Sequence, residues 1–342
     1  MHSMGWDIGG AHVKAVLLDE MGNVLQSQQI ACPLWLGLDR LETALMAMLK
    51  TFNVIPNQVT HAVTMTGELV DLFENRHQGV LEISTLINQL LKRSVLFYYM
   101  SQESEQPFVS IEGVESHAKL IASANWHASA RLIAQQLPSA LLVDIGSTTT
   151  DIIVIDGGKV VGGELTDAER MQQDTLVYTG VVRTPVMAVA QKLILDSVET
   201  NVAAEYFATM ADVYRLTQEL PEAVDMAETA DGEAKTIFAS ARRLARMVGY
   251  DVESKPLESW QQLAQACKQK QSDQIQLAVA KHLKVGMTIV SAGAGSFLVE
   301  AIAQILQYPT MSVASAMQCQ EELDVCFPAY AVARLACARS AT

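Results

Sequence analysis

Two short stretches of this sequence place an aspartate, glycines and small residues in the same order. The first contains Asp7, Gly9 and Gly10, and the second contains Asp144, Gly146, Ser147, Thr148 and Thr149. Glycines let a backbone approach a ligand closely, so that consecutive N–H groups point at phosphate oxygens. The hydroxyls of the second stretch add further donors. The two stretches therefore predict a pair of phosphate-binding loops.

Asp7 and Asp144 end apolar runs that read as strands, where a carboxylate holds Mg²⁺ directly or through water. Such an ion would bridge phosphate oxygens, so both aspartates are predicted as metal ligands and catalytic residues. Lys14 adds a cation near the first loop if strand alternation puts it on the loop's side. The alternative is that each loop is an ordinary hairpin whose aspartate caps a turn.

The two loops belong to a longer repeat. Each is followed by an apolar strand, a glycine-containing turn and another strand, and the aspartates lie 137 positions apart (144 minus 7). A repeat of this period indicates two domains of common architecture, predicted as residues 1–135 and 136–342. A third glycine-rich turn after an apolar strand holds further candidate phosphate-binding residues, Gly293, Gly295 and Ser296.

The remaining elements follow from hydrophobic periodicity. A hairpin turn is expected at Gly22 and Asn23, an amphipathic helix over 39–53 and a buried strand over 61–65. A helix is expected over 297–306. The segment 186–283 is predicted to be a helical insertion, with helix-forming runs over 203–220 and 234–248.

Composition excludes several classes of protein. The net charge of −14 argues against nucleic-acid binding, and no run approaches the roughly 20 apolar residues of a membrane span. The five cysteines lack zinc-site spacing and predict buried free thiols. No basic, apolar leader opens the chain, which predicts a cytoplasmic location. A homo-oligomer is left open.

The three glycine-rich turns together resemble the actin, sugar kinase and heat-shock ATPase superfamily. That resemblance implies an α/β fold of two ribonuclease H-like domains, with mixed sheets flanked by helices plus the helical insertion. The two loops would be its phosphate loops and 293–296 its adenosine turn. In the first loop, however, Ala11 and His12 replace the usual threonine or serine, which makes ATP a doubtful ligand.

Further motifs resemble the hydantoinase/oxoprolinase-related branch of the superfamily. They are Thr-Met-Thr-Gly-Glu-Leu at 64–69, Asn125 with Trp126, and the segment 178–185 that contains Arg183. Residues 209–214 and 245–247 are similar to proteins linked to tetrahydromethanopterin-dependent C1 metabolism, whose archaeal relatives include a synthase of methanofuran biosynthesis. The resemblance extends over nearly the whole chain.

The resemblance implies a transferase. The family synthase joins an aminomethylfuran-methyl diphosphate to the phenol of γ-glutamyl-tyramine and releases diphosphate. Its ligands would be a small-molecule diphosphate and a phenolic or amine acceptor, with Mg²⁺ beside the leaving group. Glu68 would accept the phenol proton, although it could instead begin a helix over 69–74.

Asn125, Trp126 and Arg183 are candidate substrate contacts, while a tryptophan at helical spacing is also typical of a core. The arginines 242, 243 and 246 would pair with the acidic segment 219–233 or bind a substrate carboxylate. Asp212 and Asp231 read as solvated residues, with metal binding as the alternative.

Two other functions remain open from the residues. The chain could be an ATP-dependent small-molecule kinase or an amidohydrolase-like enzyme of the oxoprolinase kind. It could also be a non-catalytic nucleotide sensor that switches by domain closure. Sequence does not identify the acceptor.

Overall fold

The computed structural model describes residues 2–92, 95–319 and 323–339, and its internal contacts divide the chain into two compact units. Unit 1 comprises Met1–Leu142, Ile153–Glu169 and Met311–Thr342, and unit 2 comprises Val143–Ile152 and Arg170–Thr310. These units interleave along the chain, whereas the sequence suggested one division after residue 135. That division into domains stays a prediction.

Unit 1 is built on a six-stranded sheet with the strand order β3-β2-β1-β4-β5-β6. Its strands are β1 (Ser3–Ile8), β2 (His12–Leu18), β3 (Val24–Ala31), β4 (Thr60–Met65), β5 (Val95–Tyr98) and β6 (Phe108–Val109). The sheet is mixed, because β1 pairs antiparallel with β2 and parallel with β4. The predicted hairpin and the predicted strand over 61–65 are confirmed.

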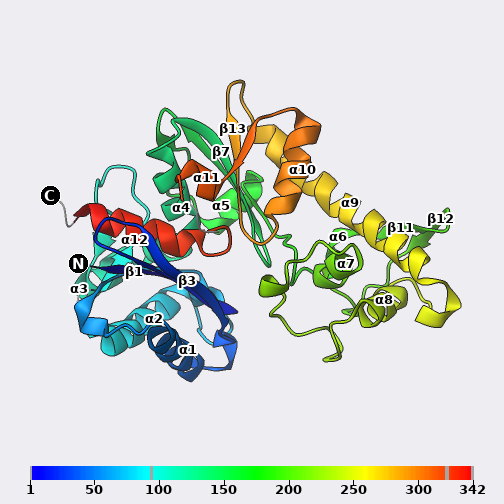
Figure 1. The fold of residues 1–342 in the computed structure, drawn as a ribbon, viewed down its shortest axis with the longest axis horizontal. Coiled ribbons are helices and arrows are strands. Elements are labelled where there is room, and N and C mark those ends of the chain that lie inside the picture. Colours follow the sequence, from blue (N-terminus) through cyan, green and yellow to red (C-terminus); the bar gives the residue numbers. More distant parts are fainter. Residues whose placement is uncertain (1, 93–94, 320–322, 340–342) are drawn as a thin grey trace. The chain divides into compact units, whose positions relative to one another are not determined.

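Helices pack on both faces of this sheet (Figure 1). They are α1 (Leu38–Thr51), α2 (Arg76–Leu91), α3 (Ile111–Ile121), α4 (Asn125–Ala134) and α12 (Phe327–Arg339). The side chains of Met4, Trp6 and Ile8 join the buried residues of α1 and α2 in one core. The amphipathic helix predicted over 39–53 is confirmed as α1.

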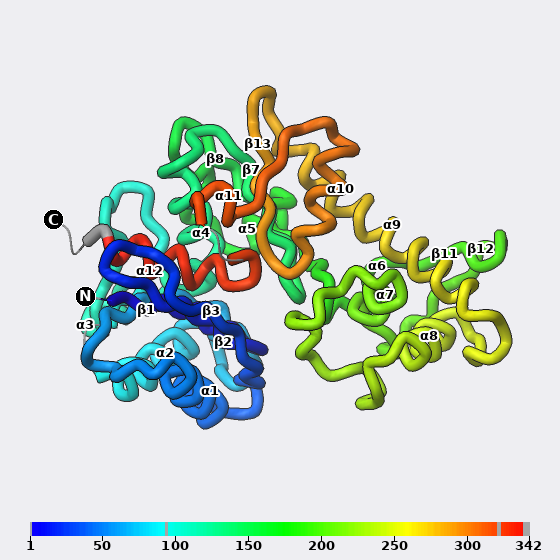
Figure 2. The backbone as a smooth tube through the Cα atoms, in the orientation of Figure 1, coloured from blue at the N-terminus to red at the C-terminus, as the bar shows by residue number. Residues whose placement is uncertain are grey.

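The opposite face of β1 packs against α12, which comes from the other end of the sequence (Figure 2). Ser3 Oγ contacts Cys337 Sγ at 2.8 Å, and a Cβ on Gly5 would lie 1.9 Å from the carbonyl oxygen of Ala329. Gly5 therefore allows the helix to approach the strand closely, and residues 3, 5 and 7 share this face because side chains alternate along a strand.

The second sheet has the order β10-β8-β7-β13-β14, with β9 paired to β8. Its strands are β7 (Ser139–Ile145), β8 (Thr150–Asp156), β9 (Lys159–Val160), β10 (Leu176–Val177), β13 (Thr288–Ala292) and β14 (Thr310–Ser312). Three helices adjoin these strands in sequence, α5 (Asp167–Gln172), α10 (Ser296–Leu306) and α11 (Val313–Ala316). The helix predicted over 297–306 is confirmed as α10.

The predicted insertion over 186–283 contains helices and one hairpin, joined by long irregular segments. It contains α6 (Val186–Val189), β11 (Lys192–Leu195), β12 (Val198–Asn201), α7 (Met210–Leu216), α8 (Ile237–Arg246) and α9 (Leu257–His282). A helix over 203–220 is wrong, because α7 begins only after a capping box of Thr209 with Asp212. It ends before Gln218, whose φ is +60°.

Five 3₁₀ turns complete the described chain: η1 (Leu34–Leu36), η2 (Pro56–Gln58), η3 (Gly67–Leu69), η4 (Glu222–Val224) and η5 (Val252–Ser254). Within the ranges described, no helix has the length and apolar character to cross a membrane.

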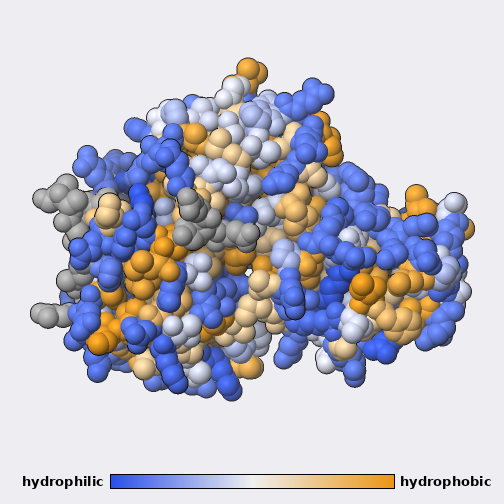
Figure 3. Space-filling model, in the orientation of Figure 1, coloured by the Kyte–Doolittle hydropathy of each residue, from blue (hydrophilic) through white to orange (hydrophobic). Residues whose placement is uncertain are grey.

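An apolar patch covers α8, whose first residues Ile237 and Phe238 are exposed (Figure 3).

Candidate functional site

The first predicted phosphate loop is a tight turn between β1 and β2. The Gly9 N–H donates to the carbonyl oxygen of His12 at 2.9 Å and closes the turn. Asp7 and Lys14 face each other across the strand pair, and Lys14 Nζ lies 3.3 Å from Asp7 Oδ2. The condition set for Lys14 is therefore met, because its side chain lies on the same side as Asp7. Gly9 and Gly10 both stay partly exposed.

Thr64 lies beside Asp7 in the parallel register of β1 with β4, so both side chains project from one face of the sheet. Asp7 Oδ1 and Thr64 Oγ1 are buried, and neither has a hydrogen-bond partner among the described residues. Buried polar atoms are rarely left unpaired in proteins. Two such atoms at the carboxyl end of neighbouring strands are therefore a place where a ligand would supply the missing partners.

The second loop repeats the first. The Gly146 N–H donates to the carbonyl oxygen of Thr149 at 2.8 Å, which is the same bond 137 positions later. Ser147 Oγ is buried and has no partner in the described chain. The loop's hydroxyls therefore include one donor that remains available to a ligand. Phosphate binding by either loop stays a prediction.

The third predicted turn packs against the end of β7. Gly293 has a φ of +83°, and a Cβ there would lie 2.2 Å from Asp144 Oδ1. The Gly295 N–H donates to the carbonyl oxygen of Ile145 at 2.8 Å, and α10 begins at Ser296. The structure therefore brings Asp144 together with Gly293, Gly295 and the start of α10.

A fourth segment, residues 179–184, wraps the second loop and was missed as part of this site. The N–H groups of Val182 and Arg183 both donate to the carbonyl oxygen of Ser147. A Cβ on Gly180 would lie 2.5 Å from backbone atoms of the loop, so only glycine fits. Arg183 itself is exposed.

Gln271, fully buried on α9, anchors this segment. Its Nε2 donates to Thr179 Oγ1 at 2.7 Å and to the Gly180 carbonyl at 2.9 Å, while its Oε1 accepts from the Tyr214 hydroxyl. Nothing in the local sequence marks this glutamine, because its partner lies 92 residues away.

The two loops differ in the charge beside them. Position 151, which is 137 residues after Lys14, holds an aspartate whose carboxylate pairs with Arg170 at 2.7 Å. The first loop therefore has a cation on its second strand, and the second loop has an anion. The first loop thus differs from the second in charge, as well as in having Ala11 and His12 where a threonine or serine is usual.

A magnesium ion fits the described donors in the way that Mg²⁺ usually binds. No cluster of three or more histidine, cysteine, aspartate or glutamate side chains occurs in the described ranges. Mg²⁺ commonly uses one or two carboxylates together with water and substrate phosphates, so a full protein cage is not required. Within unit 1 the candidate oxygens are Asp7 Oδ1 and Thr64 Oγ1, which have no partner among the described residues. Unit 2 has its own candidates, the buried Ser147 Oγ and the carboxylate of Asp144 near the end of β7.

Glu68 lies in the 3₁₀ turn η3 and is 1% exposed. The expected helix over 69–74 is wrong, because the next α-helix begins at Arg76 with Asn75 as its N-cap. Ser123 Oγ donates to Glu68 Oε1 at 2.9 Å, whereas Oε2 is buried and unpaired among the residues described. Burial raises the pKa of Glu68 to about 7, although hydrogen bonds from its own N–H and from Ser123 oppose this.

The other candidate substrate residues occupy different settings. Asn125 is partly buried at the start of α4, two residues after Ser123. Trp126 is 5% exposed and its ring meets that of His127 edge-on, as in a protein core. The candidates therefore fall into two sets, one in unit 1 and one around Asp144 with Arg183 in unit 2.

The arginine cluster of α8 is largely internal. Arg243 is fully buried and pairs with Asp212 at 2.8 Å and with Asp231 at 2.9 Å. Arg242 and Arg246 also lie within 4 Å of Asp231. The predicted pairing with the acidic segment is thus confirmed. The interpretation of Asp212 as solvated is wrong, because its carboxylate is completely buried beneath Arg215 and Arg243.

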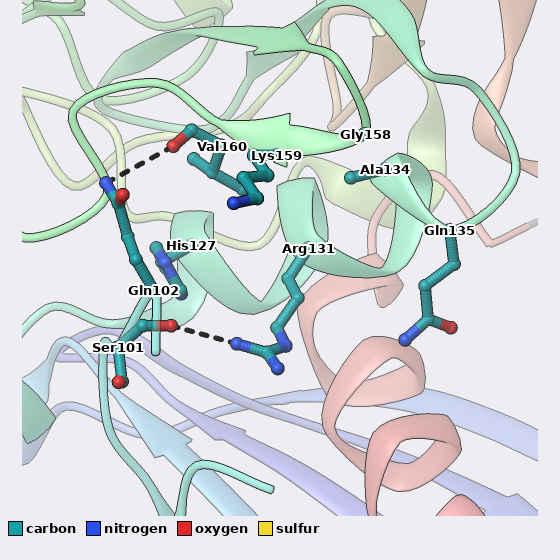
Figure 4. A pocket seen from close by; sticks show the side chains of 9 residues that line it. All are labelled: Ser101, Gln102, His127, Arg131, Ala134, Gln135, Gly158, Lys159 and Val160. Carbon is teal, nitrogen blue, oxygen red and sulfur yellow. Dashed lines mark hydrogen bonds between the residues drawn. The ribbon is translucent and has the colours of Figure 1, made fainter. Parts of the chain in front are cut away.

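A small cavity of about 170 Å³ in unit 1 was not predicted (Figure 4). His127 and Arg131 reach it from α4, and Lys159 comes from β9. Tyr98 Oη lies 2.7 Å from His127 Nδ1, and burial lowers the pKa of His127 to about 3. Arg131 donates to the carbonyls of Ser101 and Ser104, so its charge is used to fix a loop.

All three cysteines with buried side chains, Cys32, Cys267 and Cys326, carry free thiols as predicted. Cys319 and Cys337 form no disulfide among the described residues either, but they are only partly buried, which differs from the prediction.

Comparison with known proteins gives a consistent picture. The model of a family described as Hydantoinase/oxoprolinase matches residues 59–338. A Methanocaldococcus jannaschii protein named (4-{4-[2-(gamma-L-glutamylamino)ethyl]phenoxymethyl}furan-2-yl)methanamine synthase is 32% identical over 251 residues, covering 73% of this chain and 72% of that protein. A Methanococcus vannielii protein of the same name is 35% identical over 114 residues, covering 33% of this chain and 51% of its own.

Two solved structures share the fold. The activator of the 2-hydroxyisocaproyl-CoA dehydratase from Clostridium difficile, with bound ADPNP, has a TM-score of 0.50 at 12% identity, covering 100% of this chain and 96% of its own. Component A of the (R)-2-hydroxyglutaryl-CoA dehydratase from Acidaminococcus fermentans has a TM-score of 0.51 at 11% identity, with full coverage of both chains. At such identities the likeness concerns the fold alone, and the predicted α/β fold of the actin-like ATPase type is confirmed.

Proposed function

This chain belongs to the hydantoinase/oxoprolinase family, and from that premise we propose that it is a transferase of methanofuran-type cofactor synthesis. It would join an aminomethylfuran-methyl diphosphate to the phenol of γ-glutamyl-tyramine and release diphosphate. The observation that carries this proposal is the 32% identity, over 73% of the chain, to a synthase whose named product is a phenoxymethyl-furan amine.

The first loop supports a diphosphate leaving group. Lys14 lies beside Asp7, and the unpaired Asp7 Oδ1 and Thr64 Oγ1 lie on the same face. When bound there, Mg²⁺ would neutralise negative charge on phosphate oxygens. With Gly9 closing the turn, the Gly10 backbone and the lysine would hold the departing diphosphate, and fixed donors of this kind stabilise charge as it develops.

The second loop would form a phosphate site within unit 2. Ser147, Thr148 and Thr149 would donate to phosphate oxygens from the turn that the Gly146 N–H closes, and Asp144 would offer a carboxylate to Mg²⁺. Gly293, Gly295 and Ser296 shape the backbone next to Asp144. Asn125, Trp126 and Arg183 remain candidates for contacts with the acceptor.

Glu68 would act as the general base. The phenol O–H donates its proton to the carboxylate while the phenol oxygen forms a bond to the furfuryl carbon. The bond from that carbon to the diphosphate oxygen breaks, and diphosphate leaves with the electron pair. A buried carboxylate oxygen without a donor suits this task, because the substrate hydroxyl supplies one.

The test is direct synthesis. Purified protein, Mg²⁺ and both substrates should yield the ether by mass spectrometry, with one diphosphate released per ether. Omitting either substrate should abolish both products, and Asp7→Asn should abolish ether formation while the protein stays folded. Brisk ATP hydrolysis without any ether would contradict the proposal and favour a kinase or amidohydrolase. ATP binding with neither ATP hydrolysis nor ether formation would also contradict the proposal and would favour a nucleotide sensor.

A further inference from the structure

Ser123 contacts the carboxylate that we assign as the base. Its Oγ donates to Glu68 Oε1 at 2.9 Å, and Glu68 Oε2 has no partner among the described residues. We infer that Ser123 is a positioning residue, which holds Oε1 so that Oε2 faces the donor and takes its proton. This inference rests on the proposed function, because the phenol acceptor supplies that proton.

The backbone at Ser123 is strained in a way that serves this contact. Its φ is +51°, in the left-handed region that residues with a side chain seldom adopt. It lies between the end of α3 at Ile121 and the start of α4 at Asn125. Strain of this kind persists where the surrounding structure requires it, often at functional sites. Here it directs a hydroxyl towards a buried carboxylate.

A second carboxylate competes for the same hydroxyl. Asp167 Oδ2 lies 3.4 Å from Ser123 Oγ and accepts from Arg76 Nη2 at 2.7 Å. A hydroxyl has one proton, so it can favour only one of the two carboxylates at a time. Arg76 satisfies Asp167 and thereby leaves the serine proton for Glu68.

The neighbouring groups act on Glu68 in opposite directions. The Ser123 hydroxyl and the Arg76 charge both lower the pKa of Glu68, whereas the negative charge of Asp167 raises it. Among the described residues these side chains have the largest effects on the pKa of Glu68, and they come from α2, α5 and the α3–α4 connection. Removing Ser123 and removing the charge of Asp167 should therefore have opposite effects.

The experiment is the pH dependence of kcat/KM for ether formation. Glu68 can accept a proton only when its carboxyl group is ionised. On the acid limb of the profile, kcat/KM should therefore rise as the pH increases through the pKa of Glu68. Ser123→Ala should move this acid limb to higher pH by about one unit, since it removes one hydrogen bond to the ionised form. Asp167→Asn should move the limb to lower pH.

Two further variants test whether the Ser123 hydroxyl, and not the backbone conformation at Ser123, determines the position of the acid limb. Ser123→Gly removes the hydroxyl and relieves the left-handed strain, so it should shift the limb as Ser123→Ala does. Ser84→Ala, which removes another fully buried hydroxyl from α2, should leave the limb in place. Superimposed profiles for wild type, Ser123→Ala and Ser123→Gly would overturn the inference, as would shifts of Ser123→Ala and Asp167→Asn in the same direction.

A titration of Glu68 in the absence of substrates tests the role of Ser123 independently of the proposed reaction. The ¹³C carboxyl resonance of Glu68, assigned by its loss in Glu68→Gln, should titrate at higher pH in Ser123→Ala and at lower pH in Asp167→Asn. Absence of ether formation in the wild-type protein would refute the proposed function. An unmoved titration in either variant would refute the role of Ser123, whatever the reaction.

Discussion

Lys14 Nζ lies 3.3 Å from Asp7 Oδ2, across the two strands that the first loop connects. The corresponding position in the second loop holds Asp151, whose charge is balanced by Arg170. A repeated backbone thus carries opposite charges at equivalent places. In the function we propose, the first loop is therefore the one that would meet the anionic leaving group.

Replacing Lys14 by methionine should weaken diphosphate binding by roughly tenfold or more, because one charge-assisted contact is lost. Isothermal titration calorimetry with diphosphate and Mg²⁺ measures the change. The matched control is Lys192→Met, which removes an exposed lysine paired with Glu199 in the other unit. Equal affinities in wild type and Lys14→Met would show that this lysine does not meet the phosphate.

Replacing Gly180 by alanine should disturb the second loop. The added Cβ would lie 2.5 Å from Ser147 C and Thr148 N, a contact that backbone atoms cannot relieve cheaply. We expect a loss of about 1–3 kcal/mol in the free energy of unfolding, measured with urea. Diphosphate should also protect the variant less against heat.

Gly232→Ala is the control for this substitution. Its Cβ would enter open space, although the φ of +70° imposes some backbone strain. A smaller loss of stability, with full protection by diphosphate, is expected there. The same protection in Gly180→Ala would argue against a ligand at the second loop.

Gln271→Leu tests the network that holds residues 179–184. It would leave the Gly180 carbonyl and the Tyr214 hydroxyl buried without their partner, at a cost of about 1–3 kcal/mol each. Urea unfolding of the variant should show this loss. Gln269→Leu, two residues away on the exposed side of α9, should change stability little. Similar values for the two variants would contradict the network's importance.

Glu68→Gln should make the protein more stable at alkaline pH. The folded state raises the pKa of Glu68 from 4.5 to about 7, so its stabilising contribution is complete below pH 4.5 and disappears as the pH rises through 7. Above pH 8 the variant should gain on the order of 3 kcal/mol. Urea unfolding at several pH values measures this, with the exposed Glu258→Gln as control. A difference independent of pH would contradict the shift.

Local sequence patterns predicted the elements that carry the loops. The Asp-x-Gly repeat, the helix over 39–53 and the glycine turn at 293 each depend on neighbouring residues, and each was found. For Lys14 the sequence set a condition, that strand alternation place it on the loop's side, and the register of β1 with β2 sets it opposite Asp7.

Long-range contacts account for what could not be predicted. Ser123 contacts Glu68 from 55 residues away in the chain, and Asp167 lies near the same hydroxyl although 44 residues separate it from Ser123. No local period indicates either contact. Asp212 looked like a surface residue because its burial depends on α8 covering it. The run over 203–220 has helix-forming composition, but the capping box at Thr209 starts the helix later.

The packing of α12 on β1 has a consequence for synthesis on the ribosome. β1 is covered by a helix that begins only at residue 327, so its Gly5 face stays without that helix until 322 further residues (327 minus 5) have been made. During that interval the nascent sheet has one face without its helix. Chaperone binding to chains stalled on an added C-terminal linker should therefore end once the linker is long enough to carry the segment 327–339 out of the exit tunnel.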